Sequence, residues 1–379
     1  MLTRKSKNIP LELPRLGYGM MRLPTLEGSK IIDREKALPL VDRAMEAGIN
    51  YFDTAYTYHG GDSEVFLGEA LPGRYERDSY YLATKMPGSG LGSREKMEAT
   101  FAQQMERLKT DYVDFYLLHA ATREKFPYLD EVHEYFCELK TSGKIRYMGF
   151  SFHDWPENLE FMVDNYSWDF VMIQHNYVED KSGRSGEMVE ILKARGLPVF
   201  IMEPTRGGYL VNPPYEAASL LDEVRGDRSY ASLAFRWLKE IDNVQLILSG
   251  MTTREILEEN IATFEDETPQ SEGEKAAIEK AVALFEEKNA VPCTDCRYCM
   301  PCPFGVQIPK IFEIYNWKKV HDEKTFRVIR SYFSFLKDGE RGSDCQNCGA
   351  CVKECPQRIA IPEELEKIDR FFVELRDEG

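Results

Sequence analysis

Eight of the nine cysteines lie in the last quarter of the chain, in two runs of similar spacing. Both runs open with three cysteines separated by two residues and close with Cys-Pro; the members are Cys293, Cys296, Cys299 and Cys302, then Cys345, Cys348, Cys351 and Cys355. Thiolates at such intervals suit a soft metal centre, because consecutive ligands on a tight loop surround the same volume. Disulfides need an oxidising compartment, which nothing in the sequence indicates. Zinc sites use two cysteine pairs with a longer gap between them.

The spacing of the second run, C-x2-C-x2-C-x3-C-P, is that of bacterial ferredoxins, in which the fourth cysteine ligates the other cluster. The first run is one residue shorter before Cys302. Eight thiolates match two [4Fe-4S] clusters with four ligands each. The segment 308–335 between the runs has a helical pattern, similar to the helical ferredoxin modules of multi-subunit reductases. We therefore predict a small, mainly helical ferredoxin-like domain over residues 286–379.

A second group of reactive side chains lies at or just beyond the ends of apolar segments in the earlier part of the chain. Asp53, Lys85 and His119 end such segments, and Tyr58 follows in the loop after Asp53. A phenol has a pKa near 10, and a neighbouring ammonium lowers it by favouring the phenolate. Asp53 would keep Lys85 charged, and His119 would fix a substrate oxygen. Tyr58 is then a general acid for a carbonyl, or a base for an alcohol.

The elements that position these residues alternate regularly between strands and helices. The candidate strands are "RLGYGMM", "INYFDTA", "YYLATKM", "VDFYLLH", "IRYMGFS", "FVMIQHN", "LPVFIME" and "VQLILSG". Helical patterns lie between them, and Gly48, Gly143 and Gly196 stand where helix C-caps are expected. Strands that alternate with helices pair in parallel, and eight such units predict a closed (β/α)8 TIM barrel over residues 1–285. The eighth helix is expected at about 253–265, with a further helix before the cysteines.

These stretches resemble the aldo-keto reductase family over residues 14 to 262, through "LGYGMMRLP", "NYFDTAYTYHGGDSEVFLGEAL", "DYVDFYLLH", "IQHNY" and "SGMTTREILEEN". The resemblance implies that Asp53, Tyr58, Lys85 and His119 form the catalytic tetrad. It implies NAD(P)H as cofactor, with Ser151 and Gln174 at the nicotinamide carboxamide. Near the adenosine end it implies the loop 250–253, with Gly250 and Thr252, and the pair Glu259 and Asn260.

The sequence departs from the family pattern at three places. Phe152, followed by His153, stands where many members have Asn after the serine. Met202 takes the position of an aromatic residue that stacks on the nicotinamide. Gly250 and Ile256 replace basic residues that grip a 2′-phosphate, a role that Arg254 is placed to take over. These departures leave a flavin as an alternative cofactor.

The sequence favours an iron–sulfur oxidoreductase of aldo-keto reductase type that interconverts a small-molecule carbonyl and alcohol with NAD(P)H while the clusters relay electrons. The alternative is an electron-transfer or redox-sensing protein whose barrel is a docking platform or binds a flavin; a redox protein partner fits either. The net charge of −16 argues against nucleic-acid binding. No apolar run approaches the length of a membrane span, so we expect a cytoplasmic protein without a membrane partner. The isolated Cys137 is expected to be structural.

Overall fold

The computed structural model describes residues 1–181, 184–288, 290–321 and 325–377, and the chain divides into two compact units. The first unit comprises Met1–Pro204 and Ser232–Gln270, and the second comprises Thr205–Ala231 and Ser271–Gly379. Residues 205–231 and 271–285 are thus grouped with the C-terminal part of the chain. The predicted domain boundary at 285/286 stays a prediction. No helix in the described part of the chain is long and apolar enough to cross a membrane.

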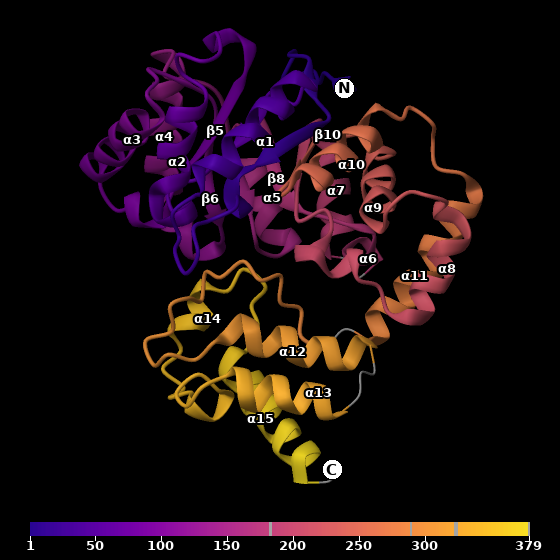
Figure 1. Cartoon of the computed structure of the whole chain (residues 1–379). Helices are drawn as coiled ribbons and strands as arrows, with labels where there is room; N and C mark the ends of the chain where they lie inside the picture. The colour runs from indigo at the N-terminus through magenta and orange to yellow at the C-terminus, as the bar shows by residue number, and fades with distance from the viewer. Residues whose placement is uncertain (182–183, 289, 322–324, 378–379) are drawn as a thin grey trace. The chain divides into compact units, whose positions relative to one another are not determined.

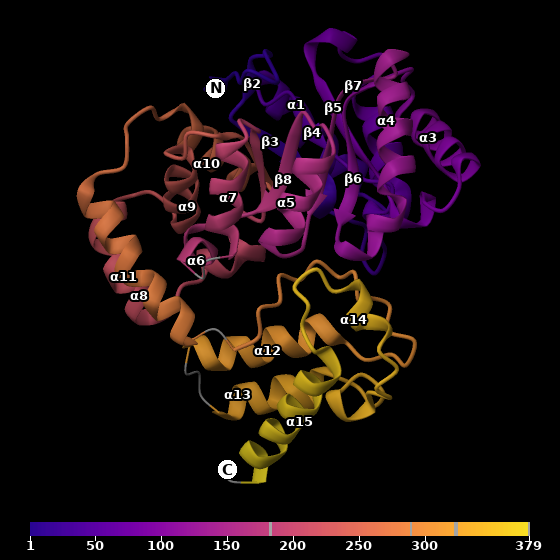
Figure 2. The same cartoon turned by 180° about the vertical axis from the view of Figure 1, so that it is seen from behind.

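Eight parallel strands of the first unit close into a barrel in the order β10-β3-β4-β5-β6-β7-β8-β9, of which β3 to β8 are labelled in Figure 2. They are β3 (Leu16–Gly19), β4 (Tyr51–Asp53), β5 (Tyr81–Met86), β6 (Val113–Ala121), β7 (Ile145–Phe152), β8 (Phe170–Gln174), β9 (Val199–Met202) and β10 (Val244–Ser249). The strands are buried almost throughout, as expected of a parallel sheet covered by helices. Each strand coincides with one of the apolar segments of the sequence, and the predicted (β/α)8 barrel is confirmed.

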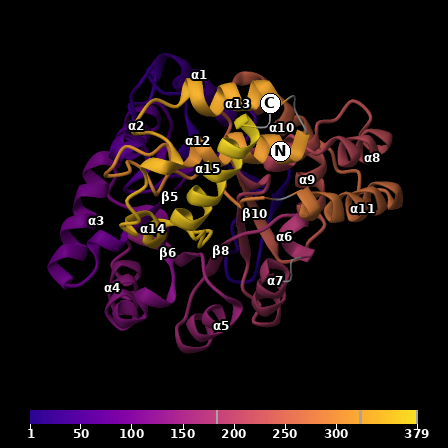
Figure 3. The ribbon, with the colours of Figure 1, turned by 90° about the horizontal axis from the view of Figure 1, so that it is seen from below.

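Helices follow the strands and cover the outside of the barrel, as Figure 3 shows for α3, α4 and α5 outside β5, β6 and β8. They are α1 (Arg34–Glu46), α2 (Asp62–Ala70), α3 (Arg94–Leu108), α4 (Leu129–Thr141), α5 (Pro156–Asn165), α6 (Tyr177–Lys181), α7 (Arg184–Ala194), α9 (Tyr230–Lys239) and α10 (Arg254–Glu265). The glycines expected after α1, α4 and α7 have positive φ angles, 78° at Gly48, 74° at Gly143 and 66° at Gly196. A left-handed residue after a helix satisfies its last carbonyl groups, and glycine adopts it without strain.

A short antiparallel pair, β1 (Thr3–Arg4) and β2 (Leu13–Pro14), lies at the amino-terminal ends of the barrel strands. The Arg4 guanidinium donates to the carbonyl oxygen of Val244, the first residue of β10, at 2.7 Å. Ile9 and Leu13 are fully buried in one cluster with the barrel residues Phe115 and Phe200. This end of the barrel is therefore filled by apolar side chains, which leaves the carboxyl ends of the strands for chemistry.

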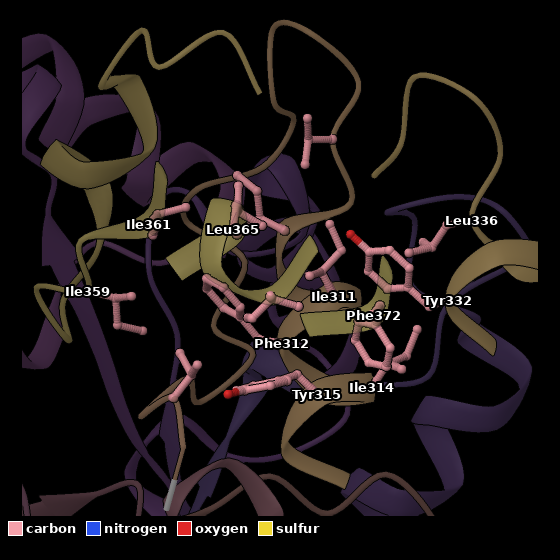
Figure 4. Packing of buried hydrophobic residues seen from close by; sticks show 14 of the residues in the cluster. Ile311, Phe312, Ile314, Tyr315, Tyr332, Leu336, Ile359, Ile361, Leu365 and Phe372 are labelled. Atoms are coloured by element: carbon pink, nitrogen blue, oxygen red, sulfur yellow. The ribbon is translucent and has the colours of Figure 1, made fainter. Parts of the chain in front are cut away.

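The second unit has its own apolar core, built by α12 (Ile308–His321), α13 (Thr325–Arg330), one π-helical turn (Ser331–Phe335) and α15 (Ile361–Asp377). Ile311, Phe312 and Leu365 converge in it (Figure 4), and the rings of Tyr332 and Phe372 stack with centroids 4.3 Å apart. Burying one such side chain stabilises the fold by about 1.5–3 kcal/mol. Six cysteines pack against this core, namely Cys293, Cys299, Cys302, Cys345, Cys351 and Cys355. The core therefore holds both cysteine runs in place.

Two further helices of the second unit, α8 (Tyr215–Arg225) and α11 (Glu272–Lys288), lie side by side (Figure 1). Arg228, just after α8, forms a 3.0 Å ion pair with the buried carboxylate of Glu274 in α11. Tyr209, just before α8, donates from its hydroxyl to the carbonyl oxygen of Phe285 in α11 at 3.0 Å. The segment between β9 and α9 is thus attached along α11.

Candidate functional site

The polar residues predicted at the strand ends lie at one end of the barrel. Asp53 is the last residue of β4, Lys85 is next to last in β5, and His119 lies near the end of β6. Gln174 and Met202 end β8 and β9, where they are register partners. Because the strands are parallel and the barrel is closed, their carboxyl ends form a single rim, and in barrels of this kind that rim carries the chemistry.

Asp53 and Lys85 form a buried ion pair on neighbouring strands. The Lys85 Nζ lies 2.5 Å from Asp53 Oδ1 and 2.7 Å from the carbonyl oxygen of Thr54. The side chains are only 1% and 3% exposed for Lys85 and Asp53. Burial lowers the pKa of Lys85, and the carboxylate of Asp53 opposes that shift. Burial likewise raises the pKa of Asp53, with the Lys85 ammonium acting against it. Each charge therefore offsets part of the cost of burying the other.

Tyr58 lies beside this pair, at the start of a tight turn, Tyr58–Gly61, that leads into α2. The turn reverses through left-handed residues, with φ angles of 52° at His59 and 68° at Gly60. The Lys85 Nζ is 4.9 Å from the centroid of the half-buried Tyr58 ring. The His119 ring meets the Tyr58 ring edge-on, with centroids 5.9 Å apart. The structure thus brings all four predicted tetrad residues together.

The imidazole of His119 is held neutral by its surroundings. Its side chain is largely buried, and burial, followed by the charges of Lys85 and Lys125, brings its pKa well below the ordinary value. The Lys125 Nζ donates to the carbonyl oxygens of His119 and Ala120 at 2.5 and 2.6 Å, which fixes the end of β6. A neutral imidazole at this position offers a hydrogen bond without adding a positive charge.

A buried polar network holds the backbone of Lys85 by a hydrogen bond, and this network was not predicted from the sequence. Gln104 of α3 donates to Glu64 Oε1 of α2 at 2.8 Å and to the carbonyl oxygen of Lys85 at 3.0 Å. Thr84 and Arg107 also donate to Glu64, at 2.6 and 3.0 Å. Glu64, Thr84 and Gln104 are fully buried. Satisfied networks of this kind fix geometry, because each unpaired group would be costly. The available signal was a polar Gln104 on the inward face of an amphipathic helix.

The residues predicted at the nicotinamide carboxamide form hydrogen bonds within the same rim. The Ser151 Oγ accepts a hydrogen bond from the Ala120 N–H at 2.8 Å and is nearly fully buried. The Gln174 Nε2 donates to Glu179 Oε1 at 2.5 Å. A serine hydroxyl that accepts one bond keeps its proton for donation, and an amide carries two N–H groups and a carbonyl oxygen. Both groups are therefore of the right chemistry for a carboxamide.

The residues predicted near the adenosine end lie around the start of α10. The Asn260 Nδ2 donates to the Ser249 Oγ at 3.0 Å, which ties α10 to the end of β10. Arg254, the first residue of α10, is about half exposed, and its Nε lies 2.5 Å from Glu258 Oε1. Gly250 packs close to Arg22, since a Cβ there would lie 3.2 Å from the Arg22 Cβ. Thr252 is half-buried in the same loop.

The cysteines are arranged in two groups, and each group takes one member from the other run. Burial raises the pKa of the Cys299 thiol to about 12, with a smaller contribution from the nearby thiols of the same group. These neighbours are Cys296, Cys293 and Cys355. The second group surrounds a small enclosed cavity, whose lining includes Cys302, Cys345, Cys348 and Cys351. The fourth cysteine of each run thus faces the other run, as in bacterial ferredoxins.

The loops that present the first three cysteines of each run share one backbone pattern. The residues on either side of Cys296 have positive φ angles, 51° at Asp295 and 63° at Arg297. The residues on either side of Cys348 do the same, with 49° at Asn347 and 72° at Gly349. Such conformations are uncommon outside glycine and persist where the surroundings enforce them. The two ligand loops therefore share a left-handed backbone at the residues on either side of their second cysteine.

No three His, Cys, Asp or Glu side chains in the described part of the chain lie close enough together to share a single metal ion. Thiolates that share a four-iron cluster stand further apart than the ligands of one ion, since each binds a different iron. The wider grouping of the cysteines is therefore compatible with iron–sulfur ligation.

A (β/α)8 barrel with an ionisable cluster at its carboxyl rim, joined to a cysteine-rich helical module, defines a redox enzyme with an iron–sulfur part. The chain belongs to the aldo/keto reductase family, whose sequence model matches residues 15–282. A model described as a 4Fe-4S dicluster domain matches residues 292–367. The protein is therefore an oxidoreductase with a C-terminal 4Fe-4S domain, as predicted.

Individual relatives align with the barrel. An uncharacterised oxidoreductase of Bacillus subtilis, YqkF, is 30% identical over 291 residues, covering 69% of this chain and 90% of the relative. The NADH-specific methylglyoxal reductase of Escherichia coli is 26% identical, covering 68% of this chain and 93% of the relative. Among solved structures, the holo form of the aldo-keto reductase AKR11C1 from Bacillus halodurans is 29% identical with a TM-score of 0.62, covering 74% of this chain and 96% of that one.

Proposed function

We propose that the protein interconverts a small-molecule carbonyl and alcohol with NAD(P)H, and that its [4Fe-4S] clusters relay electrons. The observation that carries the barrel part is the buried Asp53–Lys85 pair beside the Tyr58 ring, with the neutral His119 at the ring edge. A solvated surface cluster would not bury an ion pair, since desolvation of both charges is costly. The arrangement favours an enzyme over a docking platform.

In the proposed reaction Tyr58 gives its hydroxyl proton to the carbonyl oxygen while the carbonyl carbon accepts a hydride. A bound reduced nicotinamide supplies that hydride. The Lys85 ammonium stabilises the phenolate that Tyr58 becomes, and Asp53 keeps Lys85 charged in its buried position. The His119 imidazole orients the carbonyl oxygen by a hydrogen bond. In the reverse direction the Tyr58 phenolate takes the proton of an alcohol.

For the cofactor, we propose that Ser151 and Gln174 bind the carboxamide and that Met202 lies against the nicotinamide ring. Gly250, Thr252, Arg254 and Asn260 would contact the adenosine end. The Arg254 guanidinium already pairs with Glu258, so a 2′-phosphate would have to share it with that carboxylate. One relative is NADH-specific by name, and a Klebsiella pneumoniae reductase has been solved with NADP but is only 20% identical. Arg254 is therefore the residue at which a preference for NADH or for NADPH is to be tested.

For the C-terminal part, we propose two [4Fe-4S] clusters, one on Cys293, Cys296, Cys299 and Cys355 and one on Cys302, Cys345, Cys348 and Cys351. The two thiol groups described above support this count. Hydride transfer moves two electrons, whereas a four-iron cluster accepts one. Carbonyl reduction by NAD(P)H balances without the clusters. In the direction of alcohol oxidation, each of the two clusters would accept one electron from the NAD(P)H that forms, which would return to NAD(P)+ with release of a proton. Electrons that leave the clusters singly would pass to a redox protein partner.

The test is a combined assay of metal content and turnover on anaerobically prepared protein. We expect about eight iron and about eight sulfide per chain, four of each for each cluster. We also expect oxidation of NADH or NADPH when a small aldehyde such as methylglyoxal is added. Stoichiometric zinc without sulfide would contradict the cluster assignment. A bound flavin together with no nicotinamide-dependent turnover would contradict the reductase assignment and favour an electron-transfer protein.

A further inference from the structure

The turn that follows β9, Arg206–Val211, has an unusual backbone. Arg206, Gly207 and Gly208 are all in the left-handed region, with φ angles of 51°, 62° and 97°. Glu203, just before the turn, also has a positive φ, of 55°. Non-glycine residues rarely adopt this region, and those that do are held there by their contacts. The turn is therefore fixed by what packs against it.

The packing partner of Gly207 is the loop that carries the first two cysteines. A Cβ added at Gly207 would lie 2.4 Å from the Thr294 carbonyl oxygen, 2.8 Å from its carbonyl carbon and 2.9 Å from its Cα. All three are backbone atoms, so no side-chain rotation could relieve the collision. Thr294 stands between Cys293 and Cys296, and its side chain is almost fully buried. The backbone of the turn thus lies directly against the ligand loop.

A second contact ties the same turn to the helix that leads into this loop. Tyr209 donates to the Phe285 carbonyl oxygen at 3.0 Å, and the two rings lie with centroids 5.3 Å apart. The Arg206 guanidinium stands 5.3 Å from the centroid of the Tyr209 ring. The turn therefore contacts both α11 and the loop 293–296 that follows it in the chain.

From this geometry we infer that the turn Arg206–Val211 forms one wall of the first iron–sulfur site, and that Gly207 is a positioning residue for the ligands Cys293 and Cys296. The inference rests on the proposal that a cluster occupies this site. Its consequence is that a segment between β9 and α9 contributes to a cluster site. No side chain larger than hydrogen fits at residue 207 without displacing the ligand loop.

The neighbouring glycine offers a matched control. A Cβ at Gly208 would meet only the Val211 Cγ2, at 4.0 Å, although Gly208 has the larger φ angle. Gly208→Ala therefore strains the turn at least as much as Gly207→Ala, without a collision with Thr294. The two variants separate the effect of backbone strain from that of the contact.

The experiment measures iron and sulfide content, electron paramagnetic resonance and midpoint potentials of anaerobically prepared full-length variants. Cys296→Ser and Cys348→Ser identify which signal belongs to which cluster. We expect Gly207→Ala either to lose the first cluster, lowering iron from about eight to about four per chain, or to shift its signal and potential. The second cluster should be unchanged, and Gly208→Ala should resemble the wild type in both signals.

Equal effects of the two glycine variants, or none in either, would overturn the inference. If Gly207→Ala cannot be isolated, Tyr209→Phe decides, because it removes the bond to Phe285 while keeping the ring. It should shift the signal or potential of the first cluster only, and an unchanged first cluster would overturn the inference. A wild type that lacks the first cluster would instead contradict the proposed function.

Discussion

Replacing Lys85 by methionine removes one partner of the buried ion pair and leaves the Asp53 carboxyl in an apolar site, where its side chain is 3% exposed. Breaking such a pair destabilises a protein by about 3–5 kcal/mol, because a buried charge is left uncompensated. Burial already raises the pKa of Asp53, and the Lys85 charge is the main opposing influence. In Lys85→Met the carboxyl should therefore take up a proton and become neutral over part of the accessible pH range.

This protonation makes the loss of stability depend on pH. A carboxyl has a pKa of about 3.9 in the unfolded chain, and in the folded variant it is higher. Between those two pKa values the folded variant binds a proton that the unfolded chain does not. Protonation of Asp53 therefore stabilises the folded variant fully below about pH 4, and this stabilisation is lost as pH rises through the folded-state pKa. The slope is at most about 1.4 kcal/mol per pH unit. The variant should thus fall further behind the wild type at pH 7 than at pH 5.

The assay is urea unfolding at pH 5 and pH 7, with barrel structure followed by far-ultraviolet circular dichroism and the clusters followed separately by visible absorbance. The control is the double variant Lys85→Met with Asp53→Asn, which has no carboxyl to titrate. Its deficit relative to the wild type should be the same at both pH values. A Lys85→Met deficit that does not grow from pH 5 to pH 7 would refute the reasoning, as would a double variant with the same pH dependence.

Three further predictions follow from the sites. Cys302→Ser should abolish the electron paramagnetic resonance signal of the second cluster and Cys355→Ser that of the first; the opposite assignment would contradict the crossed thiol groups. Arg254→Ala should raise KM for NADPH by about tenfold, the scale of one charged hydrogen bond, and leave KM for NADH within about twofold; equal effects on both would exclude a 2′-phosphate contact. His175 follows the last residue of β8 and is fully buried. Burial lowers its pKa to about 3, so the unfolded chain binds the extra proton between about pH 3 and the ordinary value of about 6.5. The free energy of unfolding should therefore fall by up to about 1.4 kcal/mol per pH unit as pH drops below 6.5, and His175→Asn, unfolded in urea at pH 7 and 5, should show a shallower fall.

The barrel was predictable because its signal is repeated eight times. Each strand is a short apolar run and each helix an amphipathic segment, and the alternation itself implies parallel pairing. The pair β1 and β2 was missed, since each strand has only two residues and shows no period. The packing of residues 205–231 within the second unit could not be predicted either. A contact such as that of Gly207 with Thr294 depends on backbone proximity and leaves no pattern in the sequence.

The reactive residues of the site could be predicted from the sequence, but the hydrogen-bond network that holds them could not. Asp53, Lys85 and His119 stand out because buried strands have no packing reason to end in ionisable groups. The network around Glu64 and Gln104 needs three elements to meet, which no local pattern specifies. The roles of the residues predicted to bind NAD(P)H, and the role of the clusters, stay predictions.

The central claim is that Tyr58 donates a proton to a carbonyl with the help of Lys85. The most direct test is the single-turnover rate of carbonyl reduction by the wild type, Tyr58→Phe, Lys85→Met and the double variant, with iron content measured in each. Tyr58→Phe should be slower by at least about 100-fold with its iron content unchanged. The double variant should be nearly as fast as Tyr58→Phe alone, because both changes act on one proton. An undiminished rate in Tyr58→Phe, or a double variant slowed by the full product of the two single effects, would contradict the claim.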